Sequence, residues 1–122
     1  MSIVLVVEDD HDTADALSTA LTARGYITTT APNGREALRA LTTRPPDLII
    51  LDLLMPVMDG LAFLDVLRSY LRWSALPVIV VTAVSDPAEL QELDRFNIAR
   101  VFVKASYNLA DLLETVTRLL PV

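Results

Sequence analysis

The stretch Ile3-Val4-Leu5-Val6-Val7, followed at once by Glu8-Asp9-Asp10, decides the fold of this chain. A run of aliphatic residues without polar alternation is typical of a parallel strand that is covered on both faces. Four more short runs of β-branched or aliphatic residues follow, and segments with apolar residues at helical spacing lie between them. These runs are Ile27–Ala31, Leu48–Leu51, Val78–Thr82 and Val101–Val103.

The alternation of these runs with helical segments predicts an α/β fold: a doubly wound, flavodoxin-like, five-stranded parallel sheet with helices on both faces. The run at Ile27–Ala31 contains three threonines and is therefore expected at an edge of the sheet. That placement favours the strand order 2-1-3-4-5, in which the first and third strands are neighbours. Because no repeat, linker or low-complexity stretch interrupts the chain, residues 1–122 are expected to form one domain.

The expected helices have recognisable ends. A capping side chain followed three positions later by an acid marks four helix starts, and residues that tolerate the left-handed conformation follow two helices. Asp59 and Gly60 are interpreted as turn residues without a catalytic role. The expected caps are Asp12, Asn33, Asp86 and Asn108, the left-handed residues are Gly25 and Asn97, and the last helix is expected to bury Leu109, Leu112, Val116 and Leu120.

The composition excludes several classes of protein. Sixteen acids against ten basic residues give a net charge of −6, which argues against binding of a nucleic-acid backbone. The chain has no cysteine and a single histidine, His11, so disulfides, thiol catalysis and zinc sites built from cysteine or several histidines are excluded. It has neither a run of about 20 apolar residues nor a basic leader, and we expect a cytoplasmic protein that makes no membrane contact.

Polar side chains collect where the expected strands end. Acids follow the first and third runs, a threonine ends the fourth and precedes an alanine, and the only lysine follows the fifth. Because ligands of open parallel sheets bind at the carboxyl ends of the strands, we expect these groups to meet at one edge. Asp10 is expected to be a solvated loop acid. The residues expected to meet at this edge are Glu8, Asp9, Asp52, Thr82, Ala83 and Lys104.

Carboxylates held this close repel each other, and a hard divalent cation relieves that repulsion. Oxygen donors without histidine or cysteine favour Mg²⁺ over zinc or copper. A carboxylate beside Mg²⁺ and an ammonium group can attack phosphorus and form an aspartyl phosphate. The cation and Lys104 would then share the charge on the transferring oxygens, and Thr82 could donate a hydrogen bond to them.

Along its whole length the chain resembles the CheY-like receiver domain of two-component response regulators. The resemblance rests on four motifs in the order and spacing of that family. Each motif alone is weak, whereas the four together are specific. They are Val6-Val7-Glu8-Asp9-Asp10, Asp52-Leu53-Leu54-Met55-Pro56 with Asp59-Gly60, Val81-Thr82-Ala83 and Val103-Lys104.

The resemblance implies a role for each of these residues. Asp52 would be the phosphoacceptor, and Lys104 would pair with the phosphoryl group. Thr82 would swing toward that group on activation, and Ala83 would keep the entrance open. Mg²⁺, for which Mn²⁺ can substitute, would be bound by Asp9, Asp52 and the backbone carbonyl of Leu54, with Glu8 acting through water.

The implied function is that of a phosphoacceptor switch in a two-component phosphorelay. A histidine kinase or a histidine phosphotransfer protein would donate the phosphoryl group. The face made by the fourth helix, fifth strand and fifth helix would then change, to control a downstream protein, a covalently linked output domain or a homodimer. The chain would assist only its own phosphorylation and dephosphorylation, and would not be an enzyme. Because no effector segment follows Pro121 and Val122, it is expected to be a stand-alone regulator or a piece of a longer one.

Three positions depart from the family pattern. Ala105 stands where the family usually has a cis proline, and a cis bond before another residue costs about 3–4 kcal/mol. Val101 stands where a switch tyrosine or phenylalanine is common, and Phe102 should face the other side of its strand. Asn97 replaces a frequent glycine. Because Val101 replaces the aromatic side chain, we expect signal coupling that is weaker or differently routed.

Two other classes of function stay open. A Mg²⁺-dependent phosphatase of the aspartyl-phosphate type usually carries a second aspartate two positions after the nucleophile, where this chain has Leu54. A pseudo-receiver would only bind a partner or dimerise, although the complete set of site residues speaks against it.

Tyr70 and Trp73 are expected to pack at the end of the third helix, and an exposed pair could serve a partner.

Overall fold

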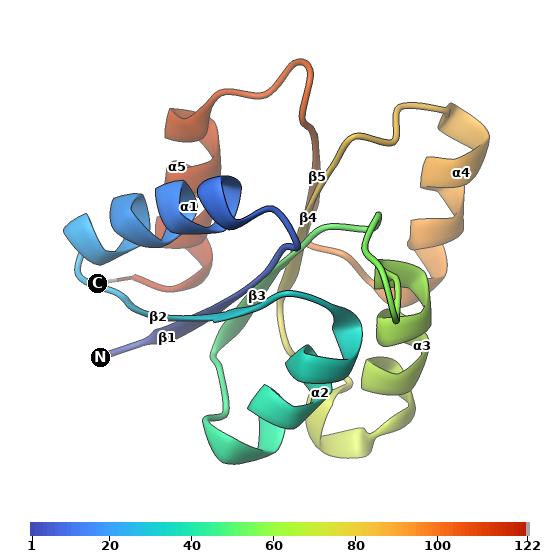
Figure 1. The fold of residues 1–122 in the computed structure, drawn as a ribbon, viewed down its shortest axis with the longest axis horizontal. Helices are drawn as coiled ribbons and strands as arrows, with labels where there is room; N and C mark the ends of the chain where they lie inside the picture. Colours follow the sequence, from blue (N-terminus) through green and yellow to red (C-terminus); the bar gives the residue numbers. More distant parts are fainter. Residues whose placement is uncertain (122) are drawn as a thin grey trace.

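The computed structural model describes residues 1–121. Five strands form a parallel sheet in the order β2-β1-β3-β4-β5 (Figure 1). This is the predicted order, and four of the five strands have the predicted bounds. The last strand begins one residue earlier, at Arg100. The strands are β1 (Ile3–Val7), β2 (Ile27–Ala31), β3 (Leu48–Leu51), β4 (Val78–Thr82) and β5 (Arg100–Val103).

Helices cover both faces of this sheet (Figure 1). Two helices, α1 and α5, share a core with one face, and the other three pack on the opposite face. The helices are α1 (His11–Ala23), α2 (Gly34–Thr43), α3 (Gly60–Ser69), α4 (Pro87–Gln91) and α5 (Leu109–Leu119), with 3₁₀ turns η1 (Leu71–Trp73) and η2 (Glu92–Phe96). Within the described chain, no helix combines the length and the apolar character that a membrane span requires.

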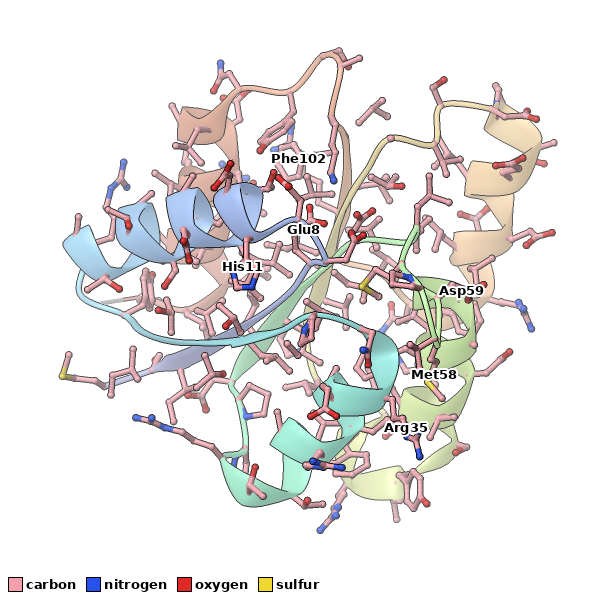
Figure 2. All side chains as sticks on the ribbon, viewed as in Figure 1. Glu8, His11, Arg35, Met58, Asp59 and Phe102 are labelled. Carbon is pink, nitrogen blue, oxygen red and sulfur yellow. The ribbon has the colours of Figure 1, made fainter. Side chains whose placement is uncertain are left out.

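Alternation along the strands builds the two cores. Val4 and Val6 point into the core under α1 and α5, whereas Leu5 and Val7 point into the core under α2 and α3. At the other end of the sheet, Phe102 lies on the α1–α5 side, as Figure 2 shows. The run β2 is only half-buried at the sheet edge, as its threonines predicted.

The capping prediction is right for three helices and wrong for α1. Asn33, Asp86 and Asn108 each accept a backbone N–H of the following helix. In α1 the cap is Asp10, whose carboxylate accepts the N–H of Thr13 at 3.0 Å. The helix therefore starts before Asp12, which lies in the first turn, where a carboxylate is still favoured by the helix dipole.

Two further features differ from expectation. Asp59 caps α3, because its side chain accepts the N–H of Ala62 at 2.9 Å. Leu109 is 40% exposed at the first position of α5, whereas Leu112 and Val116 are buried as predicted and Leu120 is half-buried. A residue at the very start of a helix lies beyond the turns that pack on the sheet, which explains the exposure of Leu109.

Backbone conformation confirms two predicted left-handed residues and adds one. Gly25 and Asn97 have φ values of 99° and 55°, respectively. Val57, in the loop between β3 and α3, has φ 69°, which is unfavourable for a β-branched residue. All peptide bonds among the described residues are trans, and the bond before Ala105 is one of them.

Val57→Asn is expected to stabilise the protein. A left-handed residue with a Cβ costs about 1–2 kcal/mol, and asparagine tolerates this conformation better than valine. Because the Val57 side chain is 74% exposed, little burial is lost. We expect the free energy of unfolding, measured by urea titration, to rise by about 1 kcal/mol. Val57→Thr, which keeps the β-branch, should give no gain, and an equal gain in both variants would contradict the explanation.

Candidate functional site

The sheet register brings the acids of two strands together. Val7 pairs with Leu51, so the next residues, Glu8 and Asp52, leave the carboxyl edge side by side. Gly60 allows the chain to return closely over this edge, because a Cβ there would lie 2.7 Å from the backbone oxygen of Asp52. The position of the phosphoacceptor candidate is therefore fixed by the strand pairing and by the start of α3.

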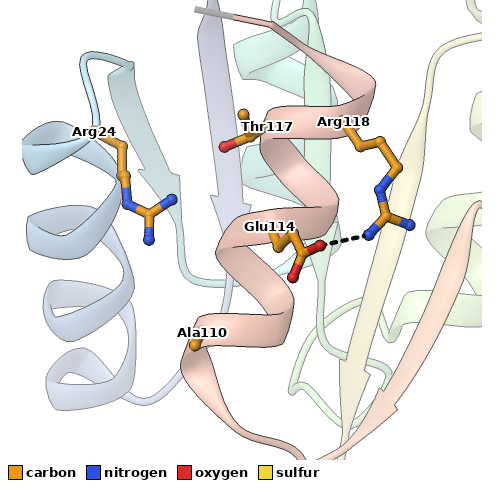
Figure 3. A pocket seen from close by; sticks show the side chains of 5 residues that line it. All are labelled: Arg24, Ala110, Glu114, Thr117 and Arg118. Carbon is orange, nitrogen blue, oxygen red and sulfur yellow. Dashed lines mark hydrogen bonds and ion pairs between the residues drawn. The ribbon is translucent and has the colours of Figure 1, made fainter.

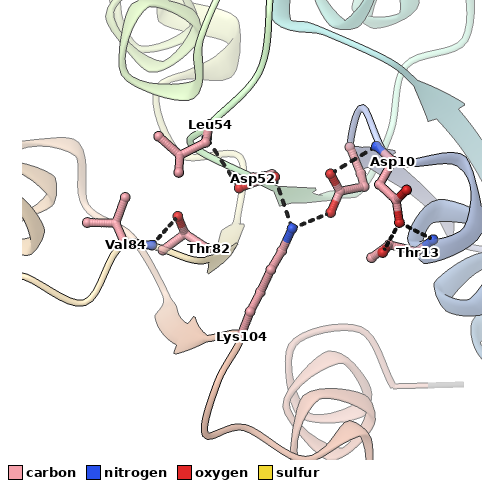
Figure 4. Close-up of polar contacts among 8 residues, drawn as sticks. Asp10, Thr13, Asp52, Leu54, Thr82, Val84 and Lys104 are labelled. Carbon is pink, nitrogen blue, oxygen red and sulfur yellow. Dashed lines mark hydrogen bonds and ion pairs between the residues drawn. The ribbon is translucent and has the colours of Figure 1, made fainter.

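Lys104 reaches the same point from the far side of the sheet. It follows β5, and its N–H donates to the carbonyl of Thr82 at 2.8 Å. Its Nζ donates to Glu8 Oε1 at 2.7 Å and to Asp52 Oδ2 at 3.1 Å (Figure 4). Glu8 and Asp52 are only 6% and 5% exposed. One ammonium group thus lies between two buried carboxylates.

The remaining oxygens of these carboxylates accept loop N–H groups. Asp52 Oδ1 accepts the N–H of Leu54 at 3.2 Å, and Glu8 Oε2 accepts that of Asp10 at 3.3 Å. Each carboxylate therefore has one oxygen toward Lys104 and the other toward its own loop. These contacts hold both carboxylates at the carboxyl edge of the sheet.

Three carboxylates are placed to bind a cation. One oxygen each of Glu8, Asp9 and Asp52 lies within 4.8 Å of the others, and Asp9 is exposed. This donor set consists of hard carboxylate oxygens, which fits Mg²⁺ and does not fit a soft metal. Leu54, whose carbonyl was the fourth predicted ligand, lies on the same loop as Asp52, to which it is hydrogen-bonded.

Burial and charge shift the pKa values in this cluster. Burial raises the pKa of Glu8 to about 7, against the lowering effect of its hydrogen bond from Lys104 and together with the nearby Asp52 carboxylate. For Lys104, burial lowers the pKa, but the hydrogen bonds to Glu8 and Asp52 outweigh it and the net shift is upward. The lysine therefore stays charged at neutral pH, whereas Glu8 titrates close to pH 7.

The pKa of Glu8 predicts a pH-dependent stability in the absence of metal. The folded chain keeps a proton on Glu8 up to about pH 7, whereas the unfolded chain releases it near its ordinary value of 4.5. Because the folded state binds more protons between these values, the free energy of unfolding should fall as pH rises through this window. The loss is on the order of 1–3 kcal/mol.

Urea titrations with a chelator present, from pH 5 to pH 8, measure this effect. Glu8→Gln should flatten the fall, because glutamine does not titrate. Mg²⁺ should restore more stability to the native chain at pH 8 than at pH 5, since deprotonated carboxylates bind it better. An unchanged pH dependence in Glu8→Gln would rule out Glu8 as its source.

Thr82 and Ala83 lie beside the cluster. The Thr82 side chain is wholly buried, and its Oγ1 accepts the N–H of Val84 at 3.2 Å (Figure 4). The structure therefore brings Glu8, Asp9, Asp52 and Lys104 into one group, and gives the Thr82 hydroxyl a bond within its own loop. Ala83 is exposed and places no large side chain at the entrance.

The sequence analysis missed a cleft next to this cluster. It measures about 190 Å³ between the β3–α3 loop and α4, and two of its walls are Leu54 and Val84. Leu54 and Val84 each lie two residues after a predicted site residue, Asp52 and Thr82 respectively. This spacing is the sequence pattern from which they could have been predicted. The other lining residues are Leu53, Asp59, Leu61, Glu89 and Glu92.

The position of the expected aromatic switch holds only an aliphatic side chain. Val101 packs, half-buried, against the core under α2 and α3. Phe102 is in the opposite core, where its ring centre lies 5.7 Å from that of Tyr107. The prediction that Phe102 faces away from the Val101 side is therefore confirmed.

A hollow between α1 and α5 does not compete as an active site (Figure 3). It is lined by Arg24, Ala110, Glu114, Thr117 and Arg118. Its one carboxylate, Glu114, is paired with Arg118 at 3.0 Å. This hollow offers neither a carboxylate cluster nor a nucleophile beside a base.

The chain belongs to the response regulator receiver domain family, whose family model matches residues 4–117. The transcriptional regulatory protein KdpE of Mycobacterium tuberculosis is 44% identical over 95 residues, which are 77% of this chain and 41% of KdpE. The DNA-binding transcriptional regulator NtrC of Escherichia coli is 45% identical over 84 residues, which are 69% of this chain and 18% of NtrC. The chain thus spans less than half the length of these curated relatives.

Solved structures agree with this family and with the CheY-like fold. Chemotaxis protein CheY4 of Vibrio cholerae superposes with a TM-score of 0.88 and 33% identity, covering 98% of this chain and 99% of that chain. The response regulator TrrA of Thermotoga maritima, solved in a complex with Mg²⁺ and BeF, gives a TM-score of 0.85 and 33% identity over 98% and 100%. The expected family and fold are confirmed.

Proposed function

We propose that this chain is a phosphorylation-dependent switch in which Asp52 accepts a phosphoryl group. The observation that carries the proposal is the cluster of Asp52, Glu8, Asp9 and Lys104 at the ends of three strands. The donor is a histidine kinase or a histidine phosphotransfer protein. The family membership of the chain supports this assignment.

In the proposed transfer, a carboxylate oxygen of Asp52 attacks phosphorus. The new O–P bond forms as the N–P bond to the donor histidine breaks, and the electron pair stays on the imidazole nitrogen. Lys104 already contacts Asp52 Oδ2. Its ammonium group would form an ion pair with the phosphoryl oxygens. Asp9, Asp52 and the carbonyl of Leu54 would hold Mg²⁺ beside the phosphoryl oxygens, with Glu8 acting through water. When bound, Mg²⁺ supplies the positive charge that the transferring oxygens require.

The proposed response begins at Thr82. Its hydroxyl accepts the N–H of Val84, and a phosphoryl group on Asp52 would attract the hydroxyl as a donor. Turning the side chain removes the bond to Val84 and frees the segment that leads into α4. This helix is short and has no buried residue, so it is suited to rearrangement. The change would spread to the face made by α4, β5 and α5.

Val101 predicts a modest response at this face. The side chain that would follow Thr82 in an aromatic switch is absent here, so coupling through β5 should be weak. Amide hydrogen exchange of residues 84–119, with and without BeF and Mg²⁺ as a phosphoryl mimic, measures the response. We expect faster exchange at residues 84–91 and little change in β5. A large change throughout α4, β5 and α5 would contradict this prediction.

Intact-mass measurement tests the function itself. Incubation with acetyl phosphate and Mg²⁺ should add one phosphoryl group per chain, and a chelator should prevent the addition. Release of phosphate from external substrates over many turnovers would instead indicate a phosphatase, contrary to our proposal that the chain is not an enzyme. Failure to gain mass would indicate a pseudo-receiver.

We also propose that the phosphorylated chain acts through an output domain or a partner protein. KdpE and NtrC are described as transcriptional regulators, and a linked output domain or a separate downstream protein would transmit the signal in this case. A homodimer is a further route. The proposed compartment is the cytoplasm, and the −6 net charge favours protein partners over direct nucleic-acid contact.

A further inference from the structure

A second surface feature lies at the amino end of the sheet, away from the phosphoacceptor. It is a cleft of about 210 Å³ between α2 and the end of α3. We call the lining residues and the neighbouring Leu71 the α2–η1 patch. The lining residues are Leu38 and Thr42 of α2, Val66 and Tyr70 of the α3 segment, and Arg72 and Trp73 of η1.

The α2–η1 patch has the composition of a binding surface. Tyr70 and Leu71 are 51% and 91% exposed. The Tyr70 and Trp73 rings lie 5.0 Å apart between centres, and the Arg72 guanidinium lies 4.3 Å from the centre of the Trp73 ring. Tyrosine, tryptophan and arginine are the residues that dominate binding energy at protein interfaces. A single exposed apolar residue needs no explanation, but this adjoining set does.

The two segments that build the patch are basic, in contrast to the rest of the chain. Residues 34–46 and 60–76 carry five arginines and two acids, whereas the remaining residues carry five basic residues and fourteen acids. Both acids of the first group are paired, Glu36 with Arg39 and Asp65 with Arg95. Figure 2 shows Arg35 at the start of α2, on the side of α3. Within residues 1–121, neither Arg35 nor Arg72 has a carboxylate within ion-pair distance.

Arg68 holds the patch in a fixed shape. Its guanidinium donates to the carbonyls of Trp73 and Leu76 at 2.9 and 2.8 Å and to that of Phe96 at 2.8 Å. One side chain of α3 therefore ties down η1 and the loop before β4. Because the surface is ordered before binding, a partner loses less free energy in organising it.

We propose that the α2–η1 patch binds a protein segment that carries acidic and apolar side chains. Apolar side chains would enter the cleft beside Trp73 and contact Leu71, and carboxylates would pair with Arg35 and Arg72. The arginines Arg35 and Arg72, which are unpaired among the described residues, disfavour a basic segment. A flat anionic membrane would also face the surrounding acids of a −6 chain, whereas a narrow segment reaches only the patch. This site is independent of the proposed phosphoacceptor function.

Trp73 is the only tryptophan of the chain, so its fluorescence reports binding at the patch. The probe is a short amphipathic peptide with leucines at helical spacing and glutamates elsewhere. The control peptide has lysines in place of the glutamates. We expect the glutamate peptide to shift the emission to shorter wavelength in a saturable way, with an affinity at least about tenfold higher than that of the lysine peptide.

Single substitutions at exposed positions localise the contact. Arg35→Glu and Leu71→Ser should each weaken binding of the glutamate peptide, the first by about tenfold. Arg24→Glu makes the same charge change in the α1–α5 hollow and should leave the affinity unchanged. Circular dichroism confirms that each variant is folded.

Four results would overturn the proposal. These are equal affinity for the two peptides, no binding of either peptide, equal weakening by Arg24→Glu, and unchanged affinity in both Arg35→Glu and Leu71→Ser. An emission shift that grows with protein concentration alone would assign the patch to a second copy of this chain. A shift with anionic vesicles but not with the glutamate peptide would assign it to a membrane surface.

Discussion

Asp52→Asn is expected to abolish phosphoryl incorporation from acetyl phosphate. Asparagine keeps the shape of the side chain, but its amide lacks the nucleophilic carboxylate oxygen that must attack phosphorus. It also removes one of the three carboxylates that lie within 4.8 Å of one another, so the affinity for Mg²⁺ should fall. The measurement is the intact mass after incubation with the donor and Mg²⁺, which should show no added phosphoryl group.

The matched control for this variant is Asp59→Asn. Asp59 is an exposed acid of the same β3–α3 loop, and it caps α3 by accepting the N–H of Ala62. Asparagine is an equally good cap, so the fold should be preserved and phosphorylation should proceed at the native rate. If phosphoryl incorporation survives in Asp52→Asn but is lost in Asp59→Asn, Asp52 is not the phosphoacceptor.

Lys104→Met should slow phosphorylation by about 10²-fold or more, because removal of one preorganised group that stabilises developing charge typically costs about 10²–10³ in rate. Methionine is similar to lysine in length and has no charge. In the native chain the ammonium contacts both Glu8 and Asp52, and it is the only lysine available. The rate is measured by quenching the reaction with acid and determining the phosphorylated fraction by mass.

Lys104→Arg separates charge from geometry. The guanidinium keeps the positive charge but is larger and planar, and the native ammonium occupies a short gap, 2.7 Å from Glu8 and 3.1 Å from Asp52. We expect a rate between those of the native chain and Lys104→Met. If Lys104→Met reacts at the native rate while remaining folded, the lysine has no part in the transfer.

The sequence predicted the sheet well because its strands are short, strongly apolar runs. In β1 and β3 every side chain is buried or nearly so, and few other structures accommodate such runs. One helix start was predicted at the wrong residue. Asp10 and Asp12 are chemically equal as caps, and only the direction in which the chain leaves β1 decides between them.

The sequence predicted which residues meet at the candidate site, but not the hydrogen bonds that their side chains form. Parallel strands deliver the residues after Val7, Leu51 and Val103 to one edge, which follows from topology alone. The two-sided contact of Lys104 and the bond between Thr82 and Val84 depend on side-chain rotamers, which no spacing rule gives. The left-handed Val57 was likewise beyond prediction, because valine is among the residues least suited to that conformation.

The most direct test of the account locates the phosphoryl group in the native chain. Borohydride reduces an acyl phosphate to an alcohol, which converts a phosphorylated aspartate into homoserine and leaves a stable mark. After incubation with acetyl phosphate and Mg²⁺, reduction and proteolysis, peptide sequencing by mass spectrometry should find homoserine at position 52 alone. Homoserine at Asp9 or at another acid, or at no position, would contradict the claim that Asp52 is the phosphoacceptor.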